Sequence, residues 1–438
     1  MTLVRLLPRF RKAYRELAVL ETREQWSRGE IESHQLERLN SVWSHAIVRV
    51  PRYRRLAKQE SLPPRFASLE EFRTLVPVLP KSLVQSRPRD FLADDAPSGA
   101  WKSTSGSTGD KTAVYWAADA YRESLRCKYR FLASWNVDIF DRIAFLWGRA
   151  ATYKSGVAGL LARVRMPVED WLRNRIRLPA YRLGPADLRR HLHRIGRFRP
   201  AAIYGYSTAV DLLAREAGES GFVCDSLRVA ILTSELTSPQ MVGTVEKALG
   251  VPAVSEYGSV ECGLLACEGP DRTLRVREDV TLLESRPRDD GRHDILVTVL
   301  NNPAFPLLRY VIGDVTDAPI EFPKRGFAKL ANLAGRDNDL ILTPSGQPRH
   351  CTSFNHIFEA MPGIRCWQVH QSGTGAVVVR VEPTDARLPL ERSGLEERIR
   401  EVVEGYPVRL EIVPTLPRTL AGKHRWIVSE MLTIPSQK

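Results

Sequence analysis

The alternation that decides the fold class lies in residues 201–258, AAIYGYSTAVDLLAREAGESGFVCDSLRVAILTSELTSPQMVGTVEKALGVPAVSEYG. The short β-branched and aromatic runs AAIYGY, RVAILT and AVSEYG predict strands, and SPQMVGTVEKAL predicts a helix between two of them. Upstream, the helical pattern AADAYRESLRCKYRFLASW precedes the strand pattern DRIAFLW. Strands that alternate with helices in this way indicate an α/β sheet with covering helices.

The flanking segments have other patterns. Residues 1–60 are predicted to be helical: GEIESHQLERLNSVWSHAIVRV has apolar residues at helical spacing, and Pro51 should stop that helix. SLEEFRTLVPVLPKSLV at 68–84 predicts short helices with proline breaks. Between 279 and 333, the runs VTLLES, HDILVTVLN, PLLRYVIGDVT and FAKLANL predict closely spaced strands. We expect these strands to form a mainly antiparallel subdomain.

The pattern resets after Gly335 into a small α+β unit. CWQVHQ and AVVVRVEP flank a Ser-Gly-Thr-Gly turn and predict a β-hairpin, followed by a helix near 389–404, the strand VRLEIVP and a basic tail strand. The charged GRDNDLI stretch suits a crossing between domains near 336–341. The expected domains are therefore a large one at 1–335 and a small one at 336–438.

Length and composition exclude several classes of protein. A chain of 438 residues and 49.5 kDa, 43% apolar and 26% charged, is neither a peptide hormone nor a disulfide miniprotein, and it has the material for a buried core. The six cysteines are scattered without a CxxC pair, which favours a reducing cytoplasm. Cys262 and Cys267 are spaced like half of a metal site, but without a second pair we favour buried, inert thiols.

The net charge of +13 comes from 64 Lys and Arg against 51 Asp and Glu. The densest basic stretch, residues 163–200, holds eleven arginines that could attract nucleic acid, an acidic carrier protein or a phosphorylated cofactor. We favour a solvated helical face, because no nucleic-acid-binding motif accompanies the charge. We therefore expect no nucleic-acid partner.

The N-terminal sequence MTLVRLLPRFRKAYRELAVL predicts a basic amphipathic helix. We favour packing of its apolar side against the protein body, with an anionic membrane surface as the alternative. Its interspersed basic residues do not fit a secretory signal. No apolar run in the chain approaches the roughly 18 residues of a spanning helix, so we expect no transmembrane segment.

The strongest local motif is a loop of hydroxyl residues and glycine. Two glycines allow a tight turn in which backbone N–H groups and hydroxyls converge on phosphate oxygens. The loop is not a Walker A motif, because that motif needs Gly directly before its Lys and Asp110 stands there. A plain surface loop is the alternative. The residues are Thr104, Ser105, Gly106, Ser107, Thr108 and Gly109, followed by Asp110, Lys111 and Thr112.

Four further motifs follow this loop in order: Tyr257-Gly258-Ser259-Val260-Glu261, the run Arg309–Asp314 (RYVIGD), Gly335–Asp339 (GRDND) and Leu416–Lys423 (LPRTLAGK). In this order the sequence resembles the adenylate-forming ligases, and within them the branch of phenylacetate-CoA ligase, coenzyme F390 synthetase and CapK-like proteins. The resemblance covers the chain from VPRYRRLAKQ at 50 to GKHRWIV at 422. It implies a large α/β N-terminal domain and a small, mobile α+β C-terminal domain.

The resemblance also implies roles for single residues. Glu261 would help hold Mg²⁺ against the phosphates of ATP, and Tyr257 would stack on adenine. Asp314 would accept hydrogen bonds from the ribose hydroxyls, assisted by Arg336. Lys423 matches the mobile catalytic lysine that reaches the α-phosphate and the carboxylate. The alternatives are an ion-paired surface Glu261, a core Tyr257 and a solvated Lys423.

The remaining residues are assigned to two groups. The nucleotide group comprises the loop Thr104–Gly109, Lys111, Glu235, Gly258 and Ser259. For the acyl pocket we nominate residues at predicted strand ends, where α/β sheets bind ligands, although core packing explains their aromatic rings equally well. If they line a pocket, their size favours an aryl or other compact acid. They are Trp147, Gly148, Tyr204, Gly205, Tyr206 and Ser234.

The chain departs from the family pattern at two positions. The family commonly has Ser or Thr directly before the glutamate of its YGxxE motif, and here that residue is Val260, with the hydroxyl one place earlier at Ser259. In the GRxDD hinge the first carboxylate is replaced by Asn338. Val260 lacks the hydroxyl that contacts the α-phosphate in the family pattern. The change to Asn338 is compatible with a hinge, because a hinge needs only a few loop residues.

The resemblance implies activation of a small carboxylic acid by ATP and Mg²⁺ through an acyl-adenylate, followed by transfer to a thiol, with coenzyme A as the expected acceptor. Alternatives are transfer to the thiol of an acyl carrier protein or to an amine in polysaccharide or natural-product assembly, and a nucleotide-binding scaffold without turnover. Val260 and Asn338 are the only support for the scaffold. The acid and the oligomeric state stay open.

Overall fold

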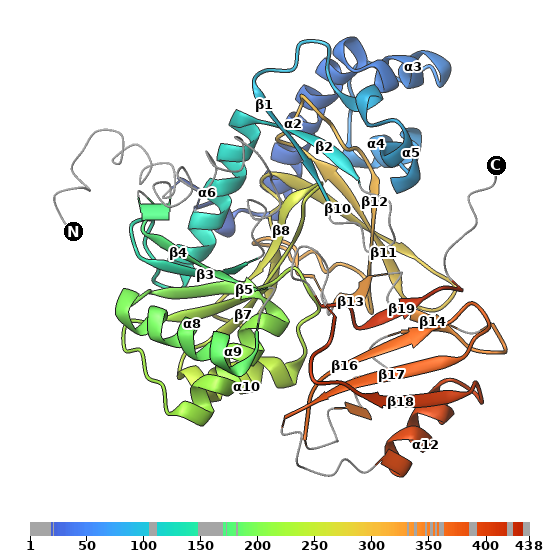
Figure 1. Ribbon diagram of the computed structural model, residues 1–438. Coiled ribbons are helices and arrows are strands. Elements are labelled where there is room, and N and C mark those ends of the chain that lie inside the picture. The colour runs from blue at the N-terminus through green and yellow to red at the C-terminus, as the bar shows by residue number, and fades with distance from the viewer. Residues whose placement is uncertain are drawn as a thin grey trace, which may run out of the picture. The chain divides into compact units, whose positions relative to one another are not determined.

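The computed structural model is shown in Figure 1. Its residues fall into two compact units, Met1–Asp141 with Val254–Leu333, and Arg142–Ala253 with Ala334–Lys438. One crossing between the units, from Leu333 to Ala334, lies near the boundary expected from the sequence, and the division into domains 1–335 and 336–438 stays a prediction. The structure describes residues 19–20, 22–104, 112–147, 170–171, 173–180, 183–330, 333–336, 340–346, 348–350, 354, 357–358, 363–384, 392–417 and 424–431.

The first unit begins with helices, as the sequence predicts. Helix α2 (Arg28–Arg49) starts with a capping box, in which the Ser27 hydroxyl accepts the Glu30 N–H at 3.3 Å and Glu30 accepts the Ser27 N–H at 2.7 Å. Pro51 ends α2 but also occupies the first position of α3 (Pro51–Gln59). Proline suits that position because its missing N–H has no partner there. The prediction that Pro51 ends the first of these helices is confirmed, and the same proline starts the next one.

Shorter helices complete this part of the first unit, with the short helices predicted at 68–84 confirmed as α4 (Leu69–Leu75) and α5 (Lys81–Ser86). Short 3₁₀ turns lie at Arg23–Gln25 and Pro88–Phe91. Apolar side chains from these helices form one hydrophobic core with side chains of residues 257–330. Its aromatic members include Trp43, Tyr53, Phe66, Phe72, Phe91 and Phe305.

The first unit also holds antiparallel strands. A hairpin of β1 (Gly99–Ser103) and β2 (Ala113–Ala117) leads into α6 (Ala118–Ser134). Two groups follow: β7 (Ala253–Ser259), β8 (Gly263–Glu268) and β9 (Leu274–Val276), then β10 (Thr281–Pro287), β11 (His293–Val299) and β12 (Tyr310–Thr316). In the predicted strand FAKLANL, residues 327–330 form no continuous strand, because Lys329 makes only isolated bridges, whereas Leu333 begins a later strand, and residues 331–332 lie outside the described residues.

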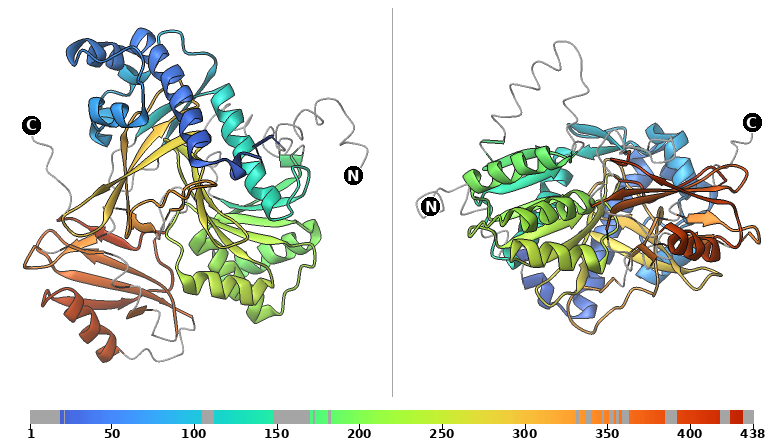
Figure 2. Two further views of the ribbon diagram at one scale, coloured as in Figure 1. Left: turned by 180° about the vertical axis from the view of Figure 1, so that it is seen from behind. Right: turned by 60° about the horizontal axis from the view of Figure 1, so that its bottom comes forward.

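The second unit contains the parallel strands that the opening pattern predicts. They lie in the order β4 (Arg175–Pro179), β3 (Ile143–Trp147), β5 (Ala202–Tyr206) and β6 (Val229–Thr233). Figure 2 shows α8 (Pro185–Phe198), α9 (Ser207–Ser220) and α10 (Pro239–Leu249) side by side along one face of these strands. None of the helices among the described residues has both the length and the apolar character needed to cross a membrane.

The C-terminal segment of the second unit has its own mixed sheet. The predicted hairpin is present as β16 (Ile364–Gln371) and β17 (Val377–Pro383), and its turn contains Gly375 at φ 88°. The strand order is β18 (Val408–Ile412), β17, β16 and β19 (Ile427–Ser429), and the predicted helix is α12 (Arg392–Val402). Strands β14 (Leu340–Leu342) and β15 (Pro348–His350) form a separate antiparallel pair. Strand β13 (Leu333–Arg336) begins at the last residue of the first unit and belongs to the sheet of β10, β11 and β12.

Gly205 occupies a tightly packed position in β5, where an added Cβ would lie 2.6 Å from the Leu146 Cβ and 2.9 Å from the Leu146 carbonyl oxygen. We expect Gly205→Ala to lower the free energy of unfolding by about 1–3 kcal/mol, because neither backbone nor a buried neighbour yields easily. Denaturant unfolding followed by circular dichroism measures this loss. In α9, Gly218→Ala is the matched control, since its Cβ would meet only the Ala248 Cβ at 3.6 Å. That variant should be as stable as the parent or slightly more stable.

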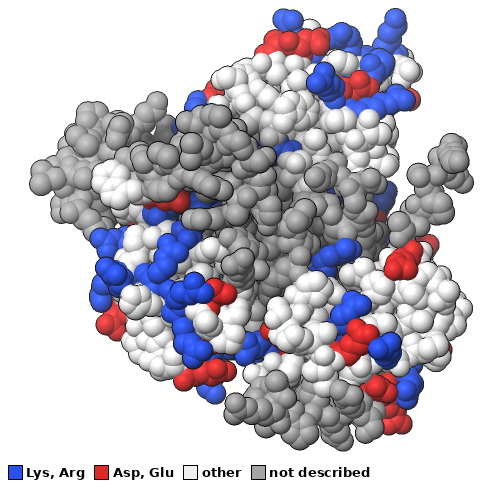
Figure 3. All heavy atoms as spheres, viewed as in Figure 1, with Lys and Arg blue, Asp and Glu red and all other residues white. Residues whose placement is uncertain are grey.

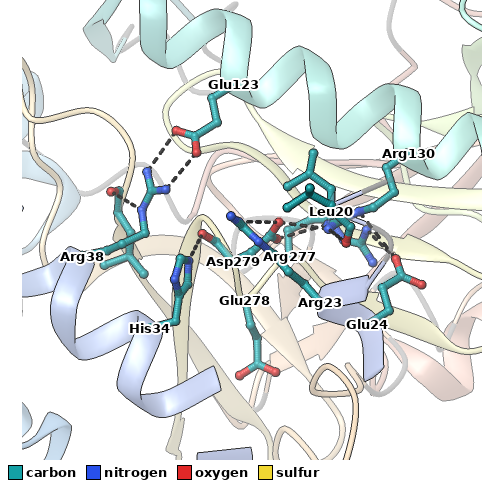
Figure 4. Close-up of polar contacts among 12 residues, drawn as sticks. Leu20, Arg23, Glu24, His34, Arg38, Glu123, Arg130, Arg277, Glu278 and Asp279 are labelled. Carbon is teal, nitrogen blue, oxygen red and sulfur yellow. Dashed lines mark hydrogen bonds and ion pairs between the residues drawn. The ribbon is translucent and has the colours of Figure 1, made fainter. Parts of the chain in front are cut away.

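An ionic cluster lies inside the first unit (Figure 4). Its centre is Asp279, whose side chain is fully buried and accepts hydrogen bonds from Arg130 Nη1 at 3.0 Å and Nη2 at 3.1 Å. Arg130 Nη1 also donates to the Leu20 carbonyl oxygen at 2.8 Å, so α6 is tied to the residues before α2. We define the ionic cluster as Arg23, Glu24, Arg28, Arg130, Arg277, Glu278 and Asp279.

Candidate functional site

The motif Tyr257–Glu261 forms the end of β7 and the turn after it. The pairing of β7 with β8 shifts register between Tyr257 and Gly258. An added Cβ on Gly258 would lie 2.5 Å from the Gly263 carbonyl oxygen, so the close approach of the two strands requires glycine. The Ser259 hydroxyl accepts the Cys262 N–H at 3.0 Å and closes the turn. The turn leaves Val260 exposed and buries Glu261.

Glu261 forms an ion pair that the sequence analysis missed. Its Oε1 atom lies 3.0 Å from Lys81 Nζ, which also donates to the Ile312 carbonyl oxygen at 3.1 Å. Glu261 is therefore ion-paired, but it is buried rather than on the surface. Lys81 begins α5, where the helix dipole disfavours a cation, and this unfavourable position is the signal that could have pointed to it.

Tyr257 and Asp314 are in direct contact, and both belong to the expected nucleotide group. The Tyr257 hydroxyl donates to Asp314 Oδ2 at 2.8 Å. Asp314 lies on β12 directly after Gly313, whose φ of 86° is in the left-handed region. The motif on β7 and the motif on β12, separated by more than fifty residues, thus meet in one unit.

Tyr310 lies at the start of β12, close to the same groups. Burial raises the pKa of its hydroxyl, and the negative charge of Glu261 raises it further. Tyr310 therefore stays neutral beside the ion pair of Glu261 and Lys81 at every pH of interest. A neutral phenol can donate a hydrogen bond without adding charge.

The ends of the hydroxyl-rich loop are held together. Thr104 N donates to the Thr112 carbonyl oxygen at 3.1 Å, and Thr112 N donates to Thr104 Oγ1 at 3.0 Å. Trp116, on β2, donates from its indole nitrogen to the Val260 carbonyl oxygen at 3.0 Å. The hairpin that carries the loop is thereby joined to the Tyr257–Glu261 turn. Ser105–Gly109 and Lys111, assigned to phosphate binding, lie outside the described residues.

Lys102, on β1, is a second cation that the sequence analysis missed. Its Nζ atom lies 3.7 Å from the centre of the Tyr121 ring and 5.7 Å from that of Trp116. Burial lowers the pKa of Lys102 to about 8. The amine thus changes charge near physiological pH, two residues before the hydroxyl-rich loop.

The two cysteines considered as half of a metal site are both buried. Burial raises the pKa of the Cys262 thiol and of the Cys267 thiol, so both are protonated at neutral pH. Within the part of the chain that the structure describes, no group of three or more His, Cys, Asp or Glu residues is arranged to hold a metal ion.

The aromatic residues nominated for the acyl pocket cluster in the second unit. The Trp147 ring lies 4.4 Å from the Tyr206 ring and 5.9 Å from the Tyr204 ring, between ring centres. Tyr204 and Tyr206 are buried, so their rings pack in the core of this unit. Ser234 follows β6 with φ 68°, and Gly148 lies outside the described residues. The nominated side chains are thus neighbours, and their role in binding an acid stays a prediction.

Glu235 lies in the second unit, directly after Ser234. Its Oε2 atom accepts the Thr208 N–H at the start of α9 at 2.9 Å, and its Oε1 atom accepts the His424 N–H at 2.7 Å. Arg336 ends β13, and its side chain lies outside the description. Lys423 and Asp337–Asp339 also lie outside the described residues, so the roles of Lys423 and Arg336 stay predictions.

The basic stretch at 163–200 includes α8 (Figure 3 shows Lys and Arg side chains over this part of the second unit). Leu188, Leu192 and Ile195 of α8 are buried, whereas its arginines lie exposed. Arg189 and Arg190 make ion pairs with Glu216 and Asp187 at 3.6 and 2.6 Å. This is the arrangement of a solvated amphipathic helix, and the absence of a nucleic-acid partner stays a prediction.

Comparison of sequences with known proteins agrees with the resemblance. No family model matches the chain. Phenylacetate-coenzyme A ligase of Escherichia coli is 24% identical over 352 residues, which are 75% of this chain and 77% of that protein. Protein CapK of Staphylococcus aureus is 24% identical over 172 residues, and the chain spans only 38% of the length of CapK. The branch predicted from the ordered motifs is the branch that these relatives represent.

Comparison with solved structures addresses the fold. A structure of 2-hydroxyisobutyryl-CoA ligase in the postadenylation state, in complex with 2-HIB-AMP, matches with a TM-score of 0.74 and 19% identity over 93% of this chain and 91% of that chain. The anthranilate CoA ligase AuaEII, in complex with anthranoyl-AMP, matches with a TM-score of 0.53 and 16% identity over 75% of this chain and 66% of that chain. The fold class expected from the sequence is confirmed.

Proposed function

The chain has the fold of the adenylate-forming ligases, and on that premise we propose that it is an AMP-forming acid–thiol ligase. It activates a small carboxylic acid with ATP to an acyl-adenylate and then transfers the acyl group to coenzyme A. The observation that carries the proposal is the meeting of two separate motifs through the Tyr257–Asp314 hydrogen bond, beside the Glu261–Lys81 ion pair. Two carboxylates and a lysine that lie close together are uncommon in an apolar protein core and are typical of a functional site.

In this proposal the nucleoside binds at Tyr257 and Asp314. The Tyr257 ring supplies an apolar platform for adenine, and the Asp314 carboxylate accepts hydrogen bonds from the ribose hydroxyls. The hydrogen bond between the two side chains orients the carboxylate before the nucleotide arrives. Gly258 and Ser259 shape the backbone around it, and Arg336 assists at the ribose.

The phosphates require positive charge and hydrogen-bond donors. We propose that Thr104–Gly109 and Lys111 supply donors, and that Lys423 neutralises the α-phosphate and the attacking carboxylate together. Val260 has no hydroxyl, and the Ser259 oxygen already accepts the Cys262 N–H. The Ser259 hydroxyl hydrogen is the remaining donor of this turn, because a hydroxyl can donate while it accepts.

Glu261 is the residue that would hold Mg²⁺. The residues fit this ion, because Mg²⁺ is usually held by one or two carboxylates together with substrate phosphates. Glu261 supplies a buried carboxylate, whose Oε1 atom accepts a hydrogen bond from Lys81. When bound, the ion would neutralise charge on the phosphates. The ion pair with Lys81 orients the Glu261 carboxylate in the protein without nucleotide.

The proposal also specifies the class of the acid and the identity of the acyl acceptor. The packed rings of Trp147, Tyr204 and Tyr206 support an aryl or other compact acid over a long fatty acid. Coenzyme A is the proposed acceptor, with rotation of the C-terminal domain between the two steps. An acyl carrier protein or an amine is the second candidate. The free thiols of the five described cysteines support a cytoplasmic location.

Pyrophosphate release from MgATP tests the proposal. The assay covers a panel of aryl, short-chain and hydroxy acids, each with and without coenzyme A, and compares the parent protein with Lys423→Ala. Release that depends on one acid and on Lys423 supports adenylation and names the substrate, and thioester formation identifies the acceptor. ATP binding without release for any acid in the panel, with any acceptor, would favour the scaffold.

A variant of Lys81 tests the ion pair. Lys81→Met leaves the buried Glu261 carboxylate without its cation, so we expect the free energy of unfolding to fall by about 1–3 kcal/mol. Equilibrium unfolding measures this change, and titration calorimetry should show altered binding of MgATP. Lys58→Met, at an exposed position of α3, is the matched control and should change neither quantity. An unchanged Lys81→Met protein would mean that the pair does not hold Glu261.

A further inference from the structure

The backbone that leads into Lys81 is held against β12. Leu79 N donates to the Arg309 carbonyl oxygen at 2.9 Å, and Val311 N donates to the Leu79 carbonyl oxygen at 3.0 Å. Arg309 Nη1 also donates to the Val76 carbonyl oxygen at 2.6 Å. The chain between α4 and α5 is therefore fixed to the strand that carries the RYVIGD motif, and it brings Lys81 to the site from a firm base.

The Lys81 side chain is much freer than this backbone. It is 30% exposed, whereas the Glu261 side chain with which it pairs is 2% exposed. Its amine lies 3.0 Å from Glu261 Oε1 and 3.1 Å from the Ile312 carbonyl oxygen. A lysine carries its charge on a flexible four-carbon stem, so the amine can leave these partners without a shift of the backbone. Of the ion pair, Lys81 is the member that can move and Glu261 is the member that stays.

The proposed function gives the Glu261 carboxylate a second cation to bind. Among the described residues, no three His, Cys, Asp or Glu side chains are grouped to hold a metal ion. A Mg²⁺ ion at Glu261 would therefore depend on this carboxylate together with the phosphates of ATP. Two cations at one carboxylate repel each other, and the repulsion is strongest where little water screens it. The buried Glu261 carboxylate cannot serve Lys81 and a divalent cation equally well.

We propose that Lys81 and Mg²⁺ compete for the Glu261 carboxylate, so that Lys81 releases Glu261 when MgATP binds. This rests on the proposed function. Lys81 neutralises the carboxylate toward ATP without a metal, which would otherwise meet an unpaired negative charge. The ion pair must be broken for MgATP, and this requirement lowers the apparent affinity, as it does for any ligand that selects a minor state. Lys81 thereby sets how strongly the site prefers MgATP to free ATP.

Nucleotide affinities with and without the metal test the competition, and no acid is added, so that no turnover occurs. Titration calorimetry on the full chain measures the dissociation constants of ATP in EDTA, of MgATP and of adenosine. In Lys81→Met, Glu261 has neither a competing nor a neutralising cation. We expect ATP in EDTA to bind about tenfold more weakly and MgATP about threefold or more tightly. Adenosine has no phosphate and should bind within about twofold of the parent affinity.

Two further variants support the comparison. Lys58→Met removes the same charge from an exposed position of α3 and should change none of the three constants. Lys81→Gln is a second neutral variant, polar enough for a partly exposed position, and it should show the same opposite shifts even if Lys81→Met does not fold.

A double-mutant cycle tests whether Lys81 acts through Glu261. Glu261→Gln removes the charge for which the two cations compete. In that background, the addition of Lys81→Met should no longer change the ratio of the ATP and MgATP dissociation constants. A change in the ratio as large as in the parent background would show that Lys81 acts on the nucleotide by another route, and would overturn the competition.

The outcomes separate the inference from the proposed function. Opposite shifts for ATP and MgATP support the competition, because a structural role of Lys81 would weaken all three ligands together. An unchanged ratio overturns the competition and leaves the proposed function standing. A parent protein that binds neither ATP nor MgATP overturns both. Opposite shifts in a protein that releases no pyrophosphate with any acid support the competition and reject the ligase function instead.

Discussion

Replacement of Lys423 by alanine is expected to lower acyl-adenylate formation about a thousandfold, while ATP still binds within a few-fold of the parent affinity. The reason is electrostatic, since a carboxylate must approach the α-phosphorus of ATP and two negative groups meet at one point. Removal of one preorganised donor in a water-poor site costs about 10²–10³ in rate, and the lysine also carries a full charge. Pyrophosphate release measures the rate, and titration calorimetry measures the affinity.

The control for this experiment is a lysine of equal charge at an exposed position. Lys329→Ala removes a surface amine that pairs with Glu321 at 3.2 Å, and it should leave adenylation unchanged. Thioester formation from preformed acyl-adenylate should survive in Lys423→Ala. Adenylation at the parent rate in Lys423→Ala would reject the assignment of this residue, and with it the match of LPRTLAGK to the catalytic motif.

The second large effect concerns stability. Asp279→Ala should lower the free energy of unfolding by about 3–5 kcal/mol, because it removes the carboxylate that accepts hydrogen bonds from both Nη atoms of the buried Arg130 guanidinium. The side chains of Arg130 and Asp279 are 1% and 0% exposed, so water does not replace the lost charge (Figure 4). Chemical denaturation followed by fluorescence measures the change.

A surface pair provides the matched control for Asp279. Asp271→Ala removes the partner of Arg275, whose nitrogen lies 2.5 Å from an Asp271 oxygen in an exposed pair. Such pairs contribute about 0–1 kcal/mol, so the two losses should differ severalfold. Equal losses in the two variants would show that the ionic cluster contributes no more than a surface pair.

The ionic cluster also predicts a pH dependence. Burial alone would raise the pKa of Asp279, but the guanidiniums of Arg130, Arg277 and Arg23 hold it below its usual value. A carboxylate with a lowered pKa stabilises the folded state above its unfolded pKa of about 3.9 and loses that contribution as the pH falls toward its folded pKa. The difference in stability between the parent and Asp279→Ala should therefore shrink below about pH 4.

The strands and helices were predictable where their patterns are local. The runs AAIYGY and RVAILT are β5 and β6, and SPQMVGTVEKAL is α10, whose Ser238 cap accepts the Met241 N–H. The predicted strand FAKLANL was wrong over residues 327–330, because Ala328 and Leu330 pack in the core of the first unit without continuous strand pairing. Periodicity reports which residues are buried, and it does not report which partner they meet.

The sequence by itself determined the fold class and the order of the motifs, and it singled out Tyr257, Glu261 and Asp314, whose roles stay predictions. These depend on periodicity, turn-forming residues and short motifs, all of which act over a few positions of the chain. The loop Thr104–Gly109 and Lys423 were also identified from the order of the motifs, and their roles stay predictions.

Only the tertiary structure decided the partners. Lys81 and Glu261 are 180 residues apart, Arg130 and Asp279 are 149 apart, and Glu235 and His424 are 189 apart. No local pattern encodes such pairs, because each exists only after chain closure has brought two faces together and excluded water from between them. Charged residues that are solvated in the unfolded chain thereby become the fixed hydrogen-bonding groups of the site and of the core.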